Sequence, residues 1–147
     1  MTRYFDSAYI AKCYLPEDGH AEISDLAAQS ERIASAAIAR LEVAAVFHRK
    51  LRERAISAAI HRELHHQFTR DVGDGVWRLL PMTEVLLVNA QTAFAKLPSS
   101  LFIRSADCLH LVAAREAGFT EIYSNDRHLL AAASHFGLKG VDISIAP

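Results

Sequence analysis

Short apolar runs alternate along the chain with longer segments whose apolar residues recur at helical spacing, and this alternation constrains the fold most strongly. Strands that alternate with helices predict a parallel sheet with right-handed crossovers. We therefore expect an α/β fold, a three-layer α/β/α domain with a central, mainly parallel sheet of four to five strands. The predicted strands are residues 2–5, 32–37, 76–81, 120–124 and 139–144, and the predicted helices are residues 7–15, 20–30, 38–54, 56–72, 83–97, 104–118 and 126–137.

The bulk composition fits one folded domain. Of the 147 residues 51% are hydrophobic, which is enough to bury a core and excludes a disordered chain. No repeat or linker divides the sequence, so we expect residues 1–147 to form a single domain. Charged residues interrupt every apolar stretch before it reaches the length of a membrane span, and no secretory signal precedes the first strand. We expect a cytoplasmic protein that does not associate with a membrane.

Two acidic residues follow predicted strands. Asp6 comes directly after the first strand, and Asp126 comes shortly after the strand at 120–124. In parallel α/β folds, ligands bind beyond the carboxyl ends of the strands. Aspartate is also a good helix N-cap, because its side-chain oxygen accepts hydrogen bonds from the free N–H groups of the first turn. For each residue the sequence leaves both interpretations open.

Two further acids lie within predicted helices. Glu42 and Asp107 each have an apolar residue four positions before and four positions after, so each shares a helix face with apolar side chains. A carboxylate in such a place costs free energy unless it is paired or binds a cation. Glu42 has alternatives, because it can pair with Arg40 or Arg49 or extend into water. Asp107 lies near the start of its helix, where the helix dipole also favours a negative charge.

The four acids have a stronger implication together than singly. Carboxylates that gather at one edge of a sheet repel one another strongly. A hard divalent cation such as Mg²⁺ or Mn²⁺ relieves this repulsion, since it prefers oxygen ligands. Cations held in this way serve phosphoryl transfer. The set therefore indicates metal-dependent chemistry on phosphate esters.

Four segments, taken in order and spacing, resemble the PIN-domain ribonucleases, and most of all the VapC-type toxins of bacterial type II toxin–antitoxin pairs. The segments are FDSAYIAKCYLPE, ARLEVAAVFHRK, RSADCLHLVAAREAG and EIYSNDRHLLAAASHFGL. The likeness runs nearly from end to end. It implies a metal-dependent endoribonuclease that hydrolyses RNA phosphodiester bonds, forms a homodimer and is inhibited by a cognate antitoxin protein encoded beside it.

The resemblance also assigns roles to residues. It implies that Ser124, two positions before the last acid, supports the site with its hydroxyl group. Many relatives have Ser or Asn two positions after the first acid, where this chain has Ala8, so Ser7 becomes the candidate for that second hydroxyl. The implied catalytic and metal-binding residues, with Mg²⁺ or Mn²⁺ as the cofactor, are Asp6, Glu42, Asp107 and Asp126.

Two arginines flank the implied acidic set. Arg104 precedes Asp107 by three positions, and Arg127 directly follows Asp126. Either residue is a candidate for contact with an RNA backbone. An ordinary solvent-exposed arginine explains each of them equally well from sequence alone.

Other functions stay open at this point. Another Mg²⁺-dependent α/β phosphohydrolase also uses acids at strand ends, but such enzymes often have a second Asp two positions after the first, and Ala8 stands there. A receiver-like signalling domain needs a phosphoacceptor Asp after a middle strand, and the strand at 76–81 ends in Pro81 without one. A catalytically idle PIN-like module that only binds a protein partner is the remaining alternative.

Overall fold

A parallel β-sheet forms the centre of the protein, whose computed structural model describes residues 1–144. The sheet consists of two sets of hydrogen-bonded parallel strands. One set has three strands in the order β1-β2-β3, and the other pairs β4 with β5. An isolated parallel bridge between Phe5 and Tyr123 joins the two sets, so the spatial order is β3-β2-β1-β4-β5. The strands are β1 (Thr2–Tyr4), β2 (Arg32–Ala36), β3 (Trp77–Leu80), β4 (Glu121–Tyr123) and β5 (Lys139–Val141).

Helices connect these strands, as the alternating sequence pattern predicts. Within residues 1–144, every helix is too short or too polar to span a bilayer. The helices are α1 (Ser7–Lys12), α2 (His20–Ala28), α3 (Ala39–Arg52), α4 (Ala58–Gly73), α5 (Glu84–Ala95), α6 (Ser105–Glu116) and α7 (Arg127–Ala132), followed by a short 3₁₀ helix, η1 (Ala133–Phe136).

The last predicted helix differs from expectation in its final turn. Residues 126–137 were expected as one helix, but α7 ends at Ala132 and the chain continues as η1. A final turn often tightens to 3₁₀ geometry where a helix ends. Gly137 then takes a φ of 70°, a left-handed conformation that glycine adopts without a steric penalty.

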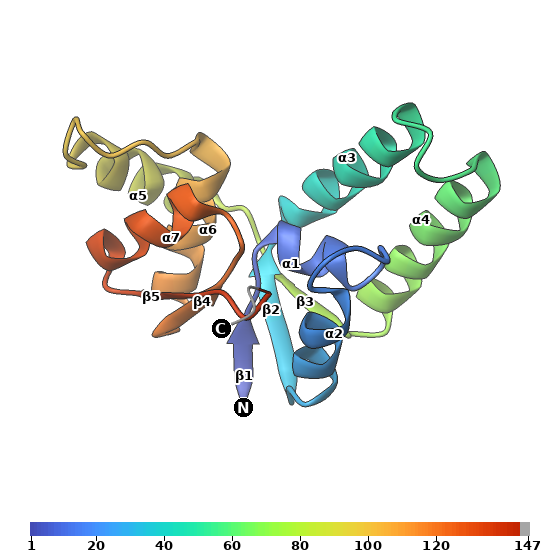
Figure 1. Ribbon diagram of the computed structural model, residues 1–147. Coiled ribbons are helices and arrows are strands. Elements are labelled where there is room, and N and C mark those ends of the chain that lie inside the picture. Colours follow the sequence, from blue (N-terminus) through green and yellow to red (C-terminus); the bar gives the residue numbers. More distant parts are fainter. Residues whose placement is uncertain (145–147) are drawn as a thin grey trace.

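The helices cover both faces of the sheet, which confirms the three-layer α/β/α architecture. Helices α1 to α4 lie on one side and α5 to α7 on the other (Figure 1). Successive residues of a strand point to opposite faces. Tyr4 accordingly packs into the hydrophobic core beneath α5 to α7, and Phe5 packs into the core beneath α1 to α4. The sheet is therefore buried on both faces, and its carboxyl edge is left to polar residues.

Candidate active site

The bridge between β1 and β4 brings two separate parts of the chain together at the carboxyl edge of the sheet. The backbone N–H of Asp6 donates to the carbonyl of Tyr123 over 3.0 Å. Ser124, the next residue, donates its hydroxyl hydrogen bond to the Asp6 carboxylate. The same hydroxyl oxygen accepts from the backbone N–H of Asp126 over 2.9 Å. Ser124 thus connects two of the predicted acids, and it is completely buried.

Asp6 is both a helix cap and a buried carboxylate. Its Oδ1 accepts from the backbone N–H of Tyr9 over 3.0 Å at the start of α1, which leaves Oδ2 for Ser124. Only 4% of Asp6 is exposed. Burial raises the pKa of Asp6 to about 6, although the nearby His110 and the hydrogen bond from Ser124 act in the opposite direction. A negative charge here costs free energy that a cation would offset.

Glu42 projects from the first turn of α3 and is held by a buried histidine. Nε2 of His110 lies 2.7 Å from Glu42 Oε1, and Nδ1 lies 2.8 Å from the hydroxyl of Tyr4. Burial alone would raise the pKa of Glu42, but the hydrogen bond and charge of His110, helped by Ser7 and Arg104, keep it below the ordinary value. Glu42 is therefore ionised at neutral pH.

Both ring nitrogens of His110 have hydrogen-bond partners. An ionised carboxylate only accepts, so Nε2 carries the proton that is donated to Glu42. Burial raises the pKa of Tyr4 far above its ordinary value, so its hydroxyl stays protonated next to Nδ1. Tyr4, His110 and Glu42 form one continuous set of hydrogen bonds.

Asp107 and Asp126 form a second acidic pair around one arginine. Asp107 Oδ2 accepts from the backbone N–H of Arg104 over 3.0 Å at the start of α6. The Arg104 guanidinium lies 3.4 Å from Asp126 Oδ2 and 4.0 Å from Asp107 Oδ2. Burial, together with the charge of Asp126, raises the pKa of Asp107 above its ordinary value. Asp126 also caps α7 by accepting from the N–H groups of His128 and Leu129.

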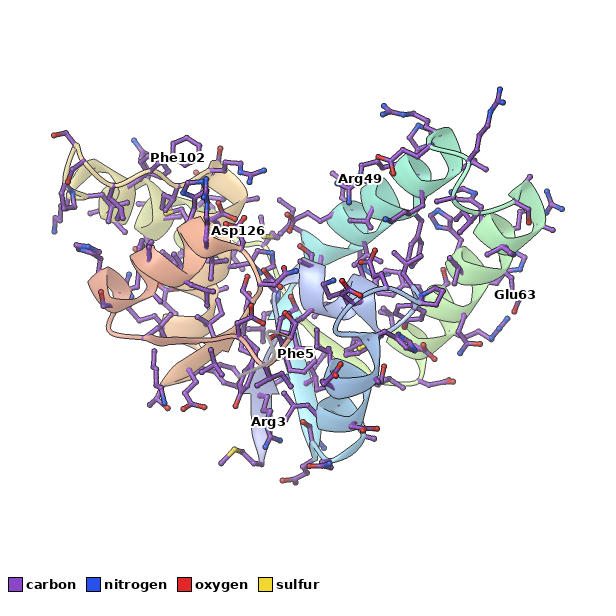
Figure 2. The ribbon with its side chains drawn as sticks, in the orientation of Figure 1. Arg3, Phe5, Arg49, Glu63, Phe102 and Asp126 are labelled. Atoms are coloured by element: carbon purple, nitrogen blue, oxygen red, sulfur yellow. The ribbon has the colours of Figure 1, made fainter. Side chains whose placement is uncertain are left out.

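All four predicted acids line one groove of about 510 Å³. They come from four different places: the end of β1, the first turn of α3, the first turn of α6 and the cap of α7. Ser7 and Arg104 line the same groove, whereas Ser124 lies buried next to it. Arg127 is exposed at the start of α7 and is not among the lining residues. In Figure 2, Asp126 lies on the side of α7 that faces α3.

The four carboxylates have the chemistry that suits a hard divalent cation, but they lie too far apart in this structure for three of them to hold one ion. No group of three or more His, Cys, Asp or Glu side chains in residues 1–144 has the geometry to hold one metal ion. Carboxylate oxygens are the ligands that Mg²⁺ and Mn²⁺ prefer. The buried Asp6, whose charge is costly, and the ionised Glu42 line the groove together with Asp107 and Asp126.

Three groups at the groove were not assigned from the sequence. His110 follows Asp107 by three positions on α6, but its bond to Glu42 joins residues 68 positions apart, which only the fold brings together. Arg49 lines the groove from α3, about two helical turns beyond Glu42. Asn125 lines it from the loop after β4, and no sequence signal distinguished it from an ordinary turn residue.

The chain matches one known protein family over most of its length. The family model described as the PIN domain matches residues 3–134. The curated proteins contain no match to the chain. PIN domains are generally nucleases, and these nucleases commonly use divalent metals such as Mg²⁺. Because the family match includes all four groove acids and most of the chain, this protein belongs to the PIN-domain family.

Proposed function

We propose that this protein is a metal-dependent endoribonuclease that hydrolyses RNA phosphodiester bonds in the acidic groove. One observation carries the proposal: four carboxylates from four separate elements line a single groove at the carboxyl edge of a parallel sheet. Three of these acids also cap helices, but carboxylates gathered in one groove repel one another, so their concentration there costs free energy. It does suit an ion that binds phosphate esters.

Asp6, Glu42, Asp107 and Asp126 are the residues that would hold Mg²⁺ or Mn²⁺. A bound ion of this kind polarises the phosphodiester and lowers the pKa of the attacking water. The chain itself keeps these ligands in place. Ser124 orients the carboxylate of Asp6 and fixes the loop that carries Asp126, and His110 fixes Glu42.

The arginines have complementary roles in this proposal. Arg104 neutralises Asp107 and Asp126 when no metal is bound, because its guanidinium lies beside both carboxylates. A metal at these acids would compete with Arg104 and release the guanidinium for an RNA phosphate. Arg127, exposed at the start of α7, is the second candidate for contact with the RNA backbone. Guanidinium groups suit both ligands because their fork matches carboxylate and phosphate oxygens.

We further propose that the protein is a VapC-type toxin that acts in the cytoplasm and is inhibited by a cognate antitoxin. The end-to-end likeness of the four segments supports this assignment. The ion pairs of Arg104 show that the groove acids accept a guanidinium group. An antitoxin that inserts a basic side chain among them would block the site. A complex with the partner bound elsewhere and the acids open to solvent would contradict this mode of inhibition.

A homodimer is also part of the proposal, and the outer face of α5 supports it. Val85, Leu87, Val88 and Phe94 are between 43% and 67% exposed on this helix. An apolar groove of about 530 Å³ lies between α5 and α6 beside them. Exposed apolar surface of this kind marks an interface. We expect Leu87→Arg to convert a dimer to a monomer in light scattering, and a wild-type monomer would contradict the homodimer.

The activity is tested with the purified chain and single-stranded RNA. Mg²⁺ or Mn²⁺ should support cleavage, EDTA should stop it, and an excess of metal added afterwards should restore it. The products should carry 5′-phosphate ends, because water is the nucleophile. Cleavage that continues undiminished in excess chelator would contradict the metal mechanism, and products with 5′-hydroxyl ends would contradict attack by water.

A further inference from the structure

One exposed aromatic side chain stands beside the acidic groove without a role in the core. Phe102 lies in the loop between α5 and α6, and 58% of it is exposed. Its ring packs edge-on against His128 of α7, with the ring centroids 4.7 Å apart and an interplanar angle of 72°. The contact fixes the direction of the phenyl ring while more than half of the residue stays open to solvent.

Phe102 and His128 are both close in sequence to residues that line the acidic groove. Phe102 is two residues before Arg104, and His128 is two residues after Asp126. Arg104 and Asp126 both line the groove and form an ion pair with each other. Figure 2 shows Phe102 above Asp126 on one side of the molecule, with Arg49 on α3 across from them. Phe102 and His128 do not line the groove themselves. Each lies two residues from a lining residue, so the aromatic pair stands just outside the Arg104 and Asp126 side of the groove, and Arg49 lines the groove from α3.

The surroundings of Phe102 are polar and indicate what it contacts. Exposed polar residues flank Phe102 along the chain, namely Ser99, Ser100 and Arg104 in its loop and Ser105 at the start of α6. The energetically important centres of protein interfaces are usually apolar and fully desolvated instead. An exposed ring next to cations is typical of surfaces that bind single-stranded nucleic acid, where aromatic side chains stack on bases and cations follow the backbone.

We propose that Phe102, oriented by His128, stacks on one unpaired base of a single-stranded RNA whose backbone passes through the groove toward Arg49. This inference rests on the proposed ribonuclease function and extends it to the substrate: a strand must present an unstacked base beside the groove. The contact is tolerant of base identity because every base has a π-face. A base within a duplex is already stacked and is not available to Phe102.

The experiment measures binding apart from cleavage. Fluorescence anisotropy is recorded in EDTA with two labelled strands of about ten nucleotides, one of poly(U) and one with the same backbone but without bases. Phe102→Ala should weaken poly(U) binding by roughly 5- to 150-fold, the range expected for one stacked base. The same variant should bind the base-free strand as the wild type does.

Other substitutions of Phe102 distinguish stacking by an aromatic ring from contact by any large apolar side chain. Phe102→Trp should bind poly(U) at least as tightly as wild type, because it keeps an aromatic face. Phe102→Leu should behave like Phe102→Ala, although it keeps an apolar side chain of similar size. Ile60→Ala, at an exposed apolar position on α4, is the matched control and should bind as wild type.

The contradicting outcomes are distinct from those of the proposed function. Equal poly(U) binding by wild type and Phe102→Ala, with Mg²⁺-dependent cleavage retained, would overturn the stacking role alone. A loss of the same size on the base-free strand would overturn it too. A change in oligomeric state without a change in RNA binding would make Phe102 a protein contact instead. Absence of cleavage by the wild type would contradict the ribonuclease proposal itself.

Discussion

His110 Nε2 lies 2.7 Å from Glu42 Oε1, so a buried imidazole on α6 fixes a groove carboxylate on α3. Its other nitrogen lies 2.8 Å from the hydroxyl of Tyr4, and only 1% of His110 is exposed. This arrangement resembles the way in which outer groups orient the ligands of metal sites. It makes His110 a positioning residue in our account.

Two substitutions of His110 test this role. Gln places an amide donor near the position of Nε2, so His110→Gln should keep the bond to Glu42. Asn places its amide near Nδ1, so His110→Asn should lose that bond and cost about 10–100-fold in Mn²⁺ affinity or cleavage rate. Titration with Mn²⁺ and cleavage rates measure the difference. If both variants lose Mn²⁺ affinity and cleavage rate equally, His110 has only a packing role in the core.

Asp6→Asn should stabilise the metal-free protein at neutral pH. Asp6 has a folded pKa of about 6, above its ordinary 3.8, so the folded state binds the proton more tightly than the unfolded state does. Stability from this group is complete below about pH 4 and is lost as the pH rises to about 6. In EDTA at pH 7.5 the variant should be more stable than wild type by up to ~3 kcal/mol.

Thermal or urea unfolding at a series of pH values measures this effect. The advantage of Asp6→Asn should shrink as the pH falls from about 6 to about 4. Mg²⁺ should raise the wild-type midpoint more than that of the variant, because a ligand that binds only the folded state stabilises it by mass action. A variant that is less stable than wild type at every pH would show that capping of α1 outweighs the cost of the buried charge.

Arg104→Ala should affect metal and RNA in opposite directions. Without the guanidinium, Asp107 and Asp126 lose their internal counter-charge, so Mn²⁺ should bind more tightly. RNA should bind less tightly, and the slope of log Kd against log salt should fall by about 0.7 for the lost phosphate contact on a single strand. Arg127→Ala is the matched control, which should weaken RNA binding and lower the salt slope without changing Mn²⁺ affinity. Unchanged Mn²⁺ affinity in Arg104→Ala would contradict the competition.

The sequence predicted the sheet, the helices and the acidic edge because each depends on local patterns. Asp6 and Asp126 follow strands, and the parallel topology then brings strand ends together. The contact between Ser124 and Asp6 joins residues 118 positions apart, and the likeness to a known family indicates only that Ser124 supports the site. The roles of Tyr4 and Arg104 depend on side-chain packing and ion pairing across elements, and no spacing rule contains that information.

The same reasoning explains why the sequence does not distinguish Phe102 from a buried loop residue. An apolar residue in a loop between two helices is usually buried, as its neighbour Ile103 is. Periodicity does not apply in a loop, so nothing separates the exposed ring from the buried one. The exposure of Phe102 and its contact with His128 follow from the docking of α7 near the start of α6.

The central claim is that the groove carboxylates, and not acids elsewhere on the surface, are required for metal-dependent RNA cleavage. The most direct measurement compares cleavage rates of wild type, Asp6→Asn and Glu63→Gln in Mg²⁺, after identical purification. Glu63 is an exposed acid on α4, away from the groove, and is the matched control (Figure 2). We predict that Glu63→Gln cleaves as wild type does and that Asp6→Asn loses at least about 100-fold. Equal cleavage by all three proteins would contradict the account.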